Sequence, residues 1–349
     1  MDFSDEKIGK IDIDGMQSQI GSLYDQISDS MDIMNSFKNK NHSYSNIIKN
    51  YNQILIIGMG GSAIGADFAR TIVGDSVSIP ISVIRDYSIP NWVDSNTFVI
   101  ASSYSGNTEE TLSAYNECLK RKCSSIVIST GGELTQIATD NKVGVIKLPI
   151  GYQPRAAVGY SLSILLLLFV EMGLISEEIL EELNNVNSNQ LGVKYIDEAK
   201  TIAQKLFKKF PIIYSGSGYM EILSARLRGQ LAENAKILSY QSTFPEHNHN
   251  EIEGWSENLI DMNSQFSIVW IKDEGDSVYV KKRMNIVEDI ISKYPGQQFK
   301  MEISSQSVLE RVFAMIHTID WVSFYLALLY DKNPSPVDNI SKLKSLMVE

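Results

Sequence analysis

Short apolar runs alternate with helical patterns along this chain, and that alternation constrains the fold more than any other feature. In the first half, the apolar runs cover residues 54–57, 81–84, 98–101, 125–129 and 145–148. Helical spacing lies between them, most clearly over residues 109–120. Continuously apolar strands separated by helices are typical of a parallel sheet buried on both faces. The sequence therefore predicts an α/β fold.

The same pattern restarts in the second half. Residues 211–236 parallel residues 53–75, because each segment is an apolar strand, a small-residue turn and a helix. The pattern continues with one strand and two helices, over residues 266–271, 278–293 and 308–330. We expect two related subdomains, residues 1–185 and residues 186–349, each a parallel sheet flanked by helices. A charged, Asn-rich stretch over residues 176–200 marks their boundary.

Two other segments are predicted as helices by their apolar residues. Residues 1–47 form an amphipathic N-terminal arm, in which apolar side chains recur at helical spacing: Ile20, Leu23, Ile27, Met31 and Met34. Residues 161–170 are almost wholly apolar, but Glu171 ends the run short of the roughly 20 residues that a membrane span needs. We therefore expect a buried core helix there.

Composition narrows the class of protein. The formal net charge of −11 argues against nucleic acid or an anionic membrane as a general partner. The two cysteines, Cys118 and Cys123, are too few for a disulfide framework and lack metal-ligand spacing, so we expect two small buried thiols. The acidic N-terminal stretch has no apolar core, so no signal peptide is expected, and a reducing cytoplasm fits.

A glycine-rich turn follows the first strand, with the sequence GMGGSAIGAD over residues 58–67. A dinucleotide-binding turn fits poorly, because the glycine spacing differs and no acidic residue closes a second strand at the ribose position. Gly61 would let the backbone approach a ligand, and Ser62 offers a hydroxyl at a helix N-terminus. A turn that only packs helix on sheet is equally compatible with the residues.

A second turn, SYSGNT over residues 103–108, joins a strand to a helix that begins with two glutamates. One hydroxyl suffices to cap a helix, so Ser103, Ser105 and Thr108 are more than capping requires. With the free N–H groups of the first helical turn, they would form a nest for a compact dianion. No lysine follows the glycines, which argues against a nucleoside triphosphate. A phosphate monoester is the expected ligand.

The stretch SYSGNTEET resembles the phosphosugar-binding loop of the SIS (sugar isomerase) domain. Four more stretches are similar to the bifunctional phosphoglucose/phosphomannose isomerase family: GMGGSAIGAD at 58–67, GYQPRAAVGYSL at 151–162, LAENAK with PEHNHNEIEGW within 231–255, and NPSPVDNISKLK at 333–344. The resemblance implies two SIS-type subdomains and a homodimer. It also implies cofactor-free interconversion of glucose 6-phosphate or mannose 6-phosphate with fructose 6-phosphate, through a cis-enediol.

The resemblance also implies roles for individual residues. Glu233 would be the base that moves the proton between C2 and C1, although a surface glutamate is the simpler interpretation of its spacing. His249 would open the sugar ring from the partner subunit; a metal site at His247 and His249 is the weaker alternative. Lys342 would donate a proton or bind the ring oxygen, and Arg155 would stabilise the enediolate.

Ser335 is expected to bind substrate and to influence which sugar enters. The family usually carries Thr at this place, and single-substrate phosphoglucose isomerases carry a larger Gln. A small hydroxyl there should leave room for both C2 epimers. Two rival functions remain open: an SIS-type regulator that binds phosphosugar without turnover, and the isomerase half of an amidotransferase. The regulator would keep the serine loop without needing Glu233, His249 and Lys342 together.

Overall fold

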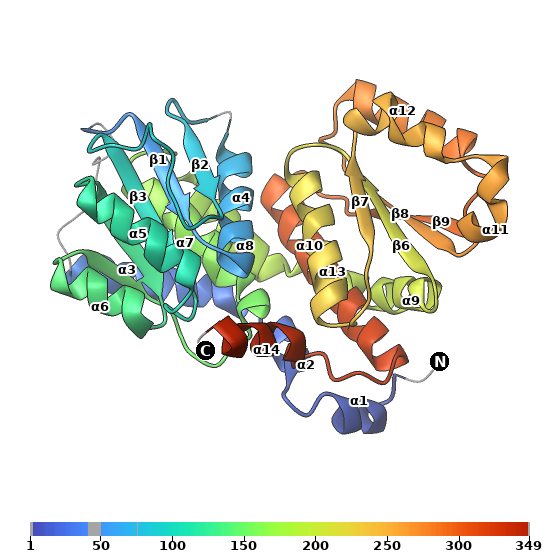
Figure 1. Cartoon of the computed structure of the whole chain (residues 1–349), viewed down its shortest axis with the longest axis horizontal. Helices are drawn as coiled ribbons and strands as arrows, with labels where there is room; N and C mark the ends of the chain where they lie inside the picture. Colours follow the sequence, from blue (N-terminus) through green and yellow to red (C-terminus); the bar gives the residue numbers. More distant parts are fainter. Residues whose placement is uncertain (1–2, 41–49, 75, 348–349) are drawn as a thin grey trace. The chain divides into compact units, whose positions relative to one another are not determined.

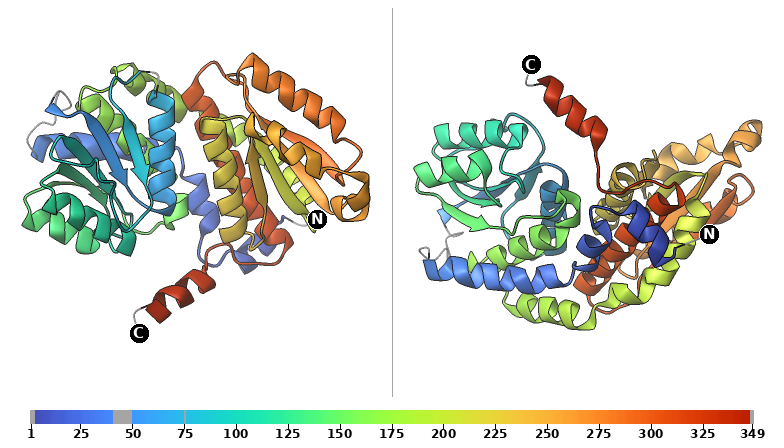
Figure 2. Two further views of the ribbon diagram at one scale, coloured as in Figure 1. Left: turned by 45° about the horizontal axis from the view of Figure 1, so that its top comes forward. Right: turned by 90° about the horizontal axis from the view of Figure 1, so that it is seen from below.

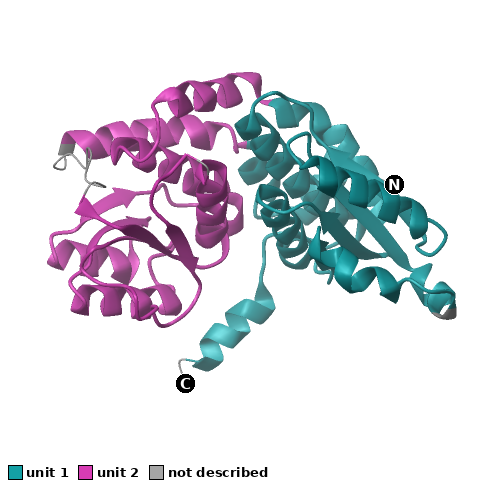
Figure 3. Ribbon diagram, turned by 90° about the horizontal axis from the view of Figure 1, so that it is seen from above, with its two compact units in different colours: residues 1–21, 191–349 teal, residues 22–190 magenta. Residues whose placement is uncertain are grey.

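The computed structural model describes residues 3–40, 50–74 and 76–347 (Figure 1). The chain divides into two compact units (Figure 3). Unit 1 comprises Met1–Gly21 and Leu191–Glu349, and unit 2 comprises Ser22–Gln190. Contacts thus group the first 21 residues with the C-terminal half, whereas the sequence predicts them with the N-terminal half.

Unit 2 is built on a parallel sheet, and all five strands predicted for it are confirmed. In the described part of the unit, the strand order is β2-β1-β3-β4-β5. The strands are β1 (Gln53–Ile57), β2 (Ile81–Ile84), β3 (Thr97–Ser102), β4 (Ser124–Ser129) and β5 (Gly144–Lys147). Nearly every residue of β1 and β3 is buried, as expected for central strands covered on both faces.

Helices cover both faces of this sheet. Alternate residues of each strand face opposite sides, so Leu55 and Val99 pack with the buried residues of α5 (Glu109–Lys120) and α6 (Gly132–Asp140). The other helices of the unit are α3 (Asp25–Lys40), α4 (Gly60–Val73), α7 (Val158–Glu171) and α8 (Glu178–Asn189). The apolar run at 161–170 lies in α7, whose residues 158–169 are all buried, so the predicted core helix is confirmed. Cys118 and Cys123 are buried free thiols, also as predicted.

Unit 1 repeats the topology with fewer strands. Its sheet is parallel, with the order β7-β6-β8-β9 in the described residues. The strands are β6 (Phe210–Ser215), β7 (Tyr240–Thr243), β8 (Phe266–Lys272) and β9 (Gln297–Glu302). In each sheet the first strand in sequence pairs with both the second and the third. The predicted relation between the two halves is therefore confirmed.

Two sets of helices sandwich the sheet of unit 1. One face packs against α12 (Val278–Ile290), through Trp270, Met284 and Val287. The other face of the sheet packs against α10 (Tyr219–Glu233). Helix α13 (Val308–Leu329) packs on α10 and also on α9 (Ile196–Leu206). Shorter elements are α11 (Ile260–Asn263), η3 (Leu191–Tyr195), η4 (Glu246–His249), η5 (Glu251–Gly254) and η6 (Glu257–Leu259).

The core helix α13 is long and apolar enough to cross a membrane by length and composition alone. Its whole apolar stretch is buried inside unit 1, so burial in a protein core accounts for the composition. It packs against helices α9 and α10.

The predicted N-terminal arm is helical but not continuous. It forms α1 (Asp5–Ile11), α2 (Met16–Gly21) and α3, with Gly15 at φ +72° between the first two. Helix α2 packs on α13 in unit 1, while α3 packs on α7 and α8 in unit 2. The apolar residues predicted for the arm's buried face include Ile20, Leu23, Ile27 and Met34, and these are buried. Residues 41–47 of the predicted arm lie outside the described residues.

The last helix, α14 (Asp338–Met347), has no buried residue. Figure 2 shows it projecting away from the sheet of unit 1 in both views. Its apolar side chains are exposed: Ile340, Leu343, Leu346 and Met347.

Candidate functional site

Two loops of unit 2 gather at the carboxyl edge of its sheet. Strands β1 and β3 are neighbours, with Ile57 opposite Ala101, and both strands run in the same direction. The glycine turn that follows β1 and the serine loop that follows β3 therefore leave the sheet at the same edge. In parallel α/β sheets, ligands bind outside this carboxyl edge. The fold thus places the two predicted phosphate-binding stretches side by side.

The serine loop is a tight, self-bonded turn. The hydroxyls of Ser103 and Thr108 lie 2.9 Å apart, and the Gly106 N–H donates to the Ser103 hydroxyl at 3.1 Å. Ser105 accepts a hydrogen bond from the Asn107 N–H at 3.2 Å and is exposed. Thr108 is the N-cap residue of α5, yet its side chain does not cap the helix. The hydroxyls therefore shape the loop and leave the helix N-terminus without a side-chain cap.

Gly106 is required by packing as well as by conformation. Its φ is +71°, and a Cβ there would lie 1.8 Å from the Gly131 carbonyl oxygen. Asn107 fixes the other side of the contact, because its Oδ1 accepts from the Glu133 N–H at 2.9 Å. The loop after β4 thus packs against the serine loop and holds its conformation.

The structure also brings Arg155 to the glycine turn. A Cβ on Gly61 would lie 2.5 Å from the Pro154 carbonyl oxygen, so only glycine allows η2 (Pro154–Ala156) to pack this closely. Arg155 is 5% exposed and Ser62 is 7% exposed. An arginine keeps its charge when buried, so a fixed positive charge lies beside the turn. Gly61, Ser62 and Arg155 therefore form one group in unit 2.

Glu233 lies in the last turn of α10, in unit 1, and is half-buried. It lines a pocket of about 560 Å³, whose other walls come from the chain after α13 and the start of α14. The lining residues include Lys236, Lys332, Asn333, Pro336 and Ile340. A half-buried carboxylate in a pocket of this size can reach a small bound molecule. The simpler interpretation of Glu233, an isolated surface glutamate, does not describe this environment.

A buried polar network sets the position of the helix that carries Glu233. Arg226 of α10 donates to Asp320 of α13 from Nε at 3.0 Å and from Nη2 at 2.6 Å. Gln230 donates to the same carboxylate at 2.6 Å, and Asn234 donates to Ser323 at 2.9 Å. These bonds fix the rotation of α10 on α13 up to the residue that follows Glu233. No local pattern indicates this network, because its bonded residues lie 89 to 94 positions apart in the chain.

Ser335 and Lys342 lie near the same part of unit 1 but in different settings. Ser335 is 2% exposed, and its N–H donates to Asn333 Oδ1 at 3.1 Å. Its neighbours Asn333 and Pro336 line the Glu233 pocket. Lys342 is exposed on α14 and is not among the pocket's lining residues, although Ile340 at the start of the same helix is.

The histidines differ sharply in environment. His249 is exposed at the end of η4. His247 is buried between two aromatic rings, and its ring centroid lies 4.5 Å from those of Phe244 and Tyr214. Burial lowers the pKa of His247. His317 is buried too; it accepts a hydrogen bond from Trp321 at 2.9 Å, and burial lowers its pKa. His247 and His317 are therefore core residues, and only His249 of these three is exposed at the surface.

Acidic and aromatic residues after His249 anchor its segment to the sheet. Glu251 accepts from the Tyr214 hydroxyl at 2.7 Å and from the Tyr240 hydroxyl at 3.1 Å. Trp255 donates to the Tyr214 hydroxyl at 3.0 Å. Burial, reinforced by Glu251, raises the pKa of Tyr214 and keeps it a donor. The stretch around His249 is thus tied to β6 and β7 by bonds that sequence reasoning did not foresee.

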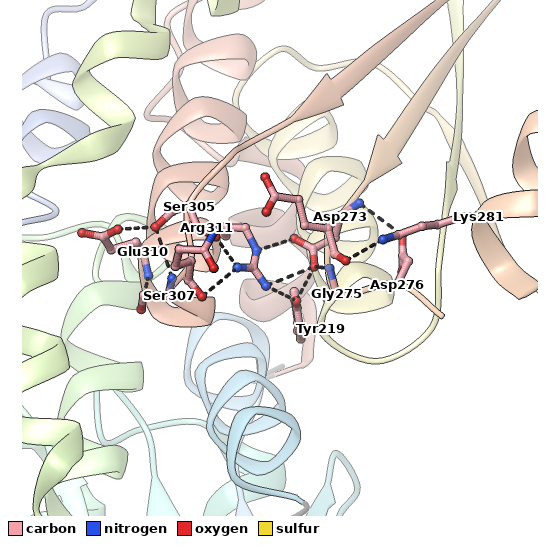
Figure 4. Close-up of polar contacts among 11 residues, drawn as sticks. Tyr219, Asp273, Gly275, Asp276, Lys281, Ser305, Ser307, Glu310 and Arg311 are labelled. Atoms are coloured by element: carbon pink, nitrogen blue, oxygen red, sulfur yellow. Dashed lines mark hydrogen bonds and ion pairs between the residues drawn. The ribbon is translucent and has the colours of Figure 1, made fainter. Parts of the chain in front are cut away.

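The loop after β8 occupies in unit 1 the position that the serine loop occupies in unit 2, but its chemistry is opposite (Figure 4). Asp273 binds Arg311 Nε at 2.8 Å and accepts from the Tyr219 hydroxyl at 2.5 Å. Asp276 accepts from the Asp273 N–H at 3.1 Å, and a Cβ on Gly216 would lie 2.1 Å from its Oδ1. Carboxylates therefore fill this edge, so unit 1 does not repeat the neutral anion nest.

No group of three or more His, Cys, Asp or Glu residues suited to a metal ion is present within residues 3–40, 50–74 and 76–347. The pair His247 and His249 does not form such a group, since one ring is stacked in the core and the other is exposed.

The chain is similar to known proteins along most of its length. Residues 196–347 match the model of the bacterial phospho-glucose isomerase C-terminal SIS domain. Bifunctional phosphoglucose/phosphomannose isomerases are 42% identical in Caldicellulosiruptor bescii (89% of this chain, 94% of the relative) and 33% identical in Aquifex aeolicus (84% and 90%).

The fold agrees with that similarity. The crystal structure of tagatose-6-phosphate ketose/aldose isomerase from Escherichia coli superposes with a TM-score of 0.67 at 14% identity, covering 92% of this chain and 94% of the other. The predicted architecture of two SIS-type subdomains is confirmed. At an identity of 42% over nearly its whole length, the chain belongs to the family of bifunctional phosphoglucose/phosphomannose isomerases.

Proposed function

We propose that this protein interconverts glucose 6-phosphate or mannose 6-phosphate with fructose 6-phosphate. The observation that supports this most directly is the position of Glu233, a half-buried carboxylate in a pocket of about 560 Å³ next to the Ser335 segment. The relatives at 42% and 33% identity carry the name of the same activity. Exchange among these three sugar phosphates would give the protein a place in carbohydrate metabolism, in the cytoplasm.

The reaction requires one carboxylate to carry out two proton transfers. In the open-chain aldose, Glu233 removes the proton from C2, the C1=O bond becomes C1–O, and a cis-enediol with a C1=C2 double bond forms. The same carboxylic acid then returns its proton to C1 while the C2 hydroxyl loses its proton and becomes the ketone. The proton lost from the C2 oxygen balances the proton that the C1 oxygen gains when the enediol forms. No net oxidation occurs, so no cofactor is required. A base held in place typically contributes a factor of about 10²–10⁴.

The remaining roles fall to other residues of the chain. The N–H groups and hydroxyls of the serine loop, with Gly61 and Ser62, bind the phosphate dianion. Arg155 stabilises the negative charge that develops on the enediol oxygens, because a fixed charge with low exposure acts most strongly there. Ring opening falls to His249 and Lys342, which are both exposed in the single chain and therefore accessible.

We further propose a homodimer in which His249 serves the active site of the partner subunit. Its exposure supports this, since a residue offered to a partner must lie at the surface of its own chain. Mixing inactive Glu233→Gln protein with inactive His249→Ala protein should restore activity, because one site of each mixed dimer then has both groups. If subunits exchange and activity stays absent, His249 acts within its own chain.

The test of the function is a coupled assay of the purified protein with each sugar phosphate, with and without a chelator. We expect turnover of both aldoses and no effect of the chelator. Glu233→Gln should keep sugar-phosphate binding and lose at least about a hundredfold in kcat. Binding without turnover in the wild type would instead identify a phosphosugar-binding regulator, and near-normal kcat in the variant would remove Glu233 from the chemistry.

A further inference from the structure

Lys236 joins two parts of the Glu233 pocket. It stands just after the end of α10, three residues beyond Glu233. Its ammonium donates to the carbonyl of Glu233, to the carbonyl of Pro336 at 2.5 Å and to the carbonyl of Pro334 at 3.4 Å. An ammonium group has three donor hydrogens, so one group can serve all three carbonyls.

The backbone at Lys236 also marks it as a special position. Its φ is +61°, in the left-handed region that residues with a Cβ seldom adopt. The chain reverses there, and the Ile237 N–H donates to the Leu231 carbonyl at 3.2 Å, which closes the end of α10. A cation at this end of a helix is favoured by the helix dipole. The lysine is therefore held where the helix ends and the pocket begins.

The two proline carbonyls stand on either side of Ser335, which is buried. The opposite side of the same segment is fixed separately, because Asn333 accepts from the Ser335 N–H at 3.1 Å and donates to Asp14 at 2.7 Å. Lys236 thus supplies the link from this segment to the helix of Glu233, and Asn333 supplies a link to the N-terminal helices of unit 1.

We propose that Lys236 is a positioning residue that fixes the Ser335 segment relative to Glu233. The proposal rests on the proposed function, in which Glu233 moves the proton and Ser335 leaves room for both C2 epimers. The epimers differ at C2, the carbon from which Glu233 removes the proton in the proposed reaction. Losing the link should therefore change the preference between the sugars, whereas the phosphate-binding loop of unit 2 is untouched.

The chain offers a matched control in Lys332. It lines the same pocket, it is exposed, and its ammonium makes no hydrogen bond or ion pair within the described residues. Lys332→Met and Lys236→Met therefore remove the same charge from the same pocket, and only the second removes the link. Lys236→Arg restores donors on a long side chain and serves as the conservative variant.

The kinetic readout is the ratio of kcat/KM for mannose 6-phosphate to kcat/KM for glucose 6-phosphate. We expect Lys236→Met to shift this ratio by at least about fivefold, Lys332→Met to stay within about twofold of wild type, and Lys236→Arg to recover most of the shift. A general loss of structure would lower both values together. Equal ratios in the two Met variants would overturn the proposal.

A second readout does not depend on activity. Hydrogen exchange of the peptide spanning residues 331–340 should become about tenfold faster in Lys236→Met, and should stay unchanged in Lys332→Met. Unchanged exchange in Lys236→Met would reject the positioning role even in an active enzyme. If the wild type turns over neither sugar, the proposed function fails, while the exchange experiment still decides whether Lys236 holds the segment.

Discussion

Removing the carboxylate of Asp320 should destabilise unit 1 more than almost any other single substitution. The side chains of Asp320 and Arg226 are each 3% exposed, and Gln230 donates to the same carboxylate. Asp320→Ala leaves the guanidinium buried without its counter-charge. Breaking a buried pair in this way costs about 3–5 kcal/mol, because the remaining charge keeps its desolvation penalty and loses its partner.

The effect should extend to the chemistry. Residues 226, 230 and 233 are spaced by four and three along α10, so they share one face of the helix. A helix that loses the bonds at Arg226 and Gln230 can rotate on α13, and Glu233 would rotate with it. We therefore expect kcat to fall in Asp320→Ala even under conditions where the variant remains folded.

Urea unfolding followed by tryptophan fluorescence measures the stability change. The signal reports mainly on unit 1, which contains Trp255, Trp270 and Trp321. The control is Glu257→Ala, which breaks an exposed pair with Lys293 and should leave the free energy of unfolding nearly unchanged.

The same urea unfolding measurement can also refute the role of the buried pair. A loss of less than about 1 kcal/mol in Asp320→Ala would mean that the buried pair does not stabilise the fold as the geometry implies. The double variant Arg226→Met, Asp320→Leu removes both charges and should recover much of the loss, since an apolar pair of similar volume is tolerated in such positions. No recovery would show that the carboxylate acts through something other than Arg226.

Three further outcomes are expected. Ser105→Ala should raise KM about tenfold or more, because one hydrogen bond to a charged oxygen is worth about 1.5–3 kcal/mol; unchanged kinetics would place the phosphate elsewhere. Ser335→Gln should slow mannose 6-phosphate more than glucose 6-phosphate, by about tenfold in the ratio, whereas equal slowing would separate this position from epimer preference. Burial, with repulsion from Asp273, raises the pKa of Asp276 to about 6 from 3.8. Because the folded state then holds the proton more tightly, stability should fall as pH rises from about 4 to 6; Asp276→Asn should flatten that slope in pH-dependent melting and add about 1 kcal/mol at pH 7, after allowance for partial exposure.

Much of the fold could be predicted because its strands carry a strong local signal. The central strands are apolar on both faces, so β1, β3, β6 and β8 stand out from any neighbouring sequence. The edge strands β7 and β9 are half-buried and polar on one face, and the sequence did not reveal them. Residues 176–200, predicted as a charged boundary, contain the whole of α8, which buries only Leu183 and Val186. A helix with so narrow an apolar face resembles a linker in sequence.

In the candidate site, too, contiguous stretches could be predicted from the sequence, whereas contacts between distant residues could not. The serine loop and the glycine turn are contiguous stretches, so their residue types alone were enough to predict a neutral anion nest. Asp320 and the carbonyls of Pro334 and Pro336 come from segments 90 to 100 residues away from the groups they bind beside Glu233, so no local pattern could identify them as its surroundings. Resemblance to a family could point to Glu233, and only the packing of α10 on α13 explains how its position is held.

The two halves of the chain show how one topology supports opposite chemistry at the same place. In both, the third strand of the sheet ends in a loop that leads to a helix, beside a small-residue turn that follows the first strand. In unit 2 that loop carries hydroxyls and a glycine packed against backbone, which leaves donors for an anion. In unit 1 it carries Asp273 and Asp276, and the carboxylate of Asp276 lies against Gly216, where an anion would otherwise approach the turn. Because a carboxylate at that position repels phosphate, the phosphate-binding role that we propose for unit 2 does not extend to unit 1. The α10 of unit 1 instead carries Glu233, the residue that we propose transfers the proton.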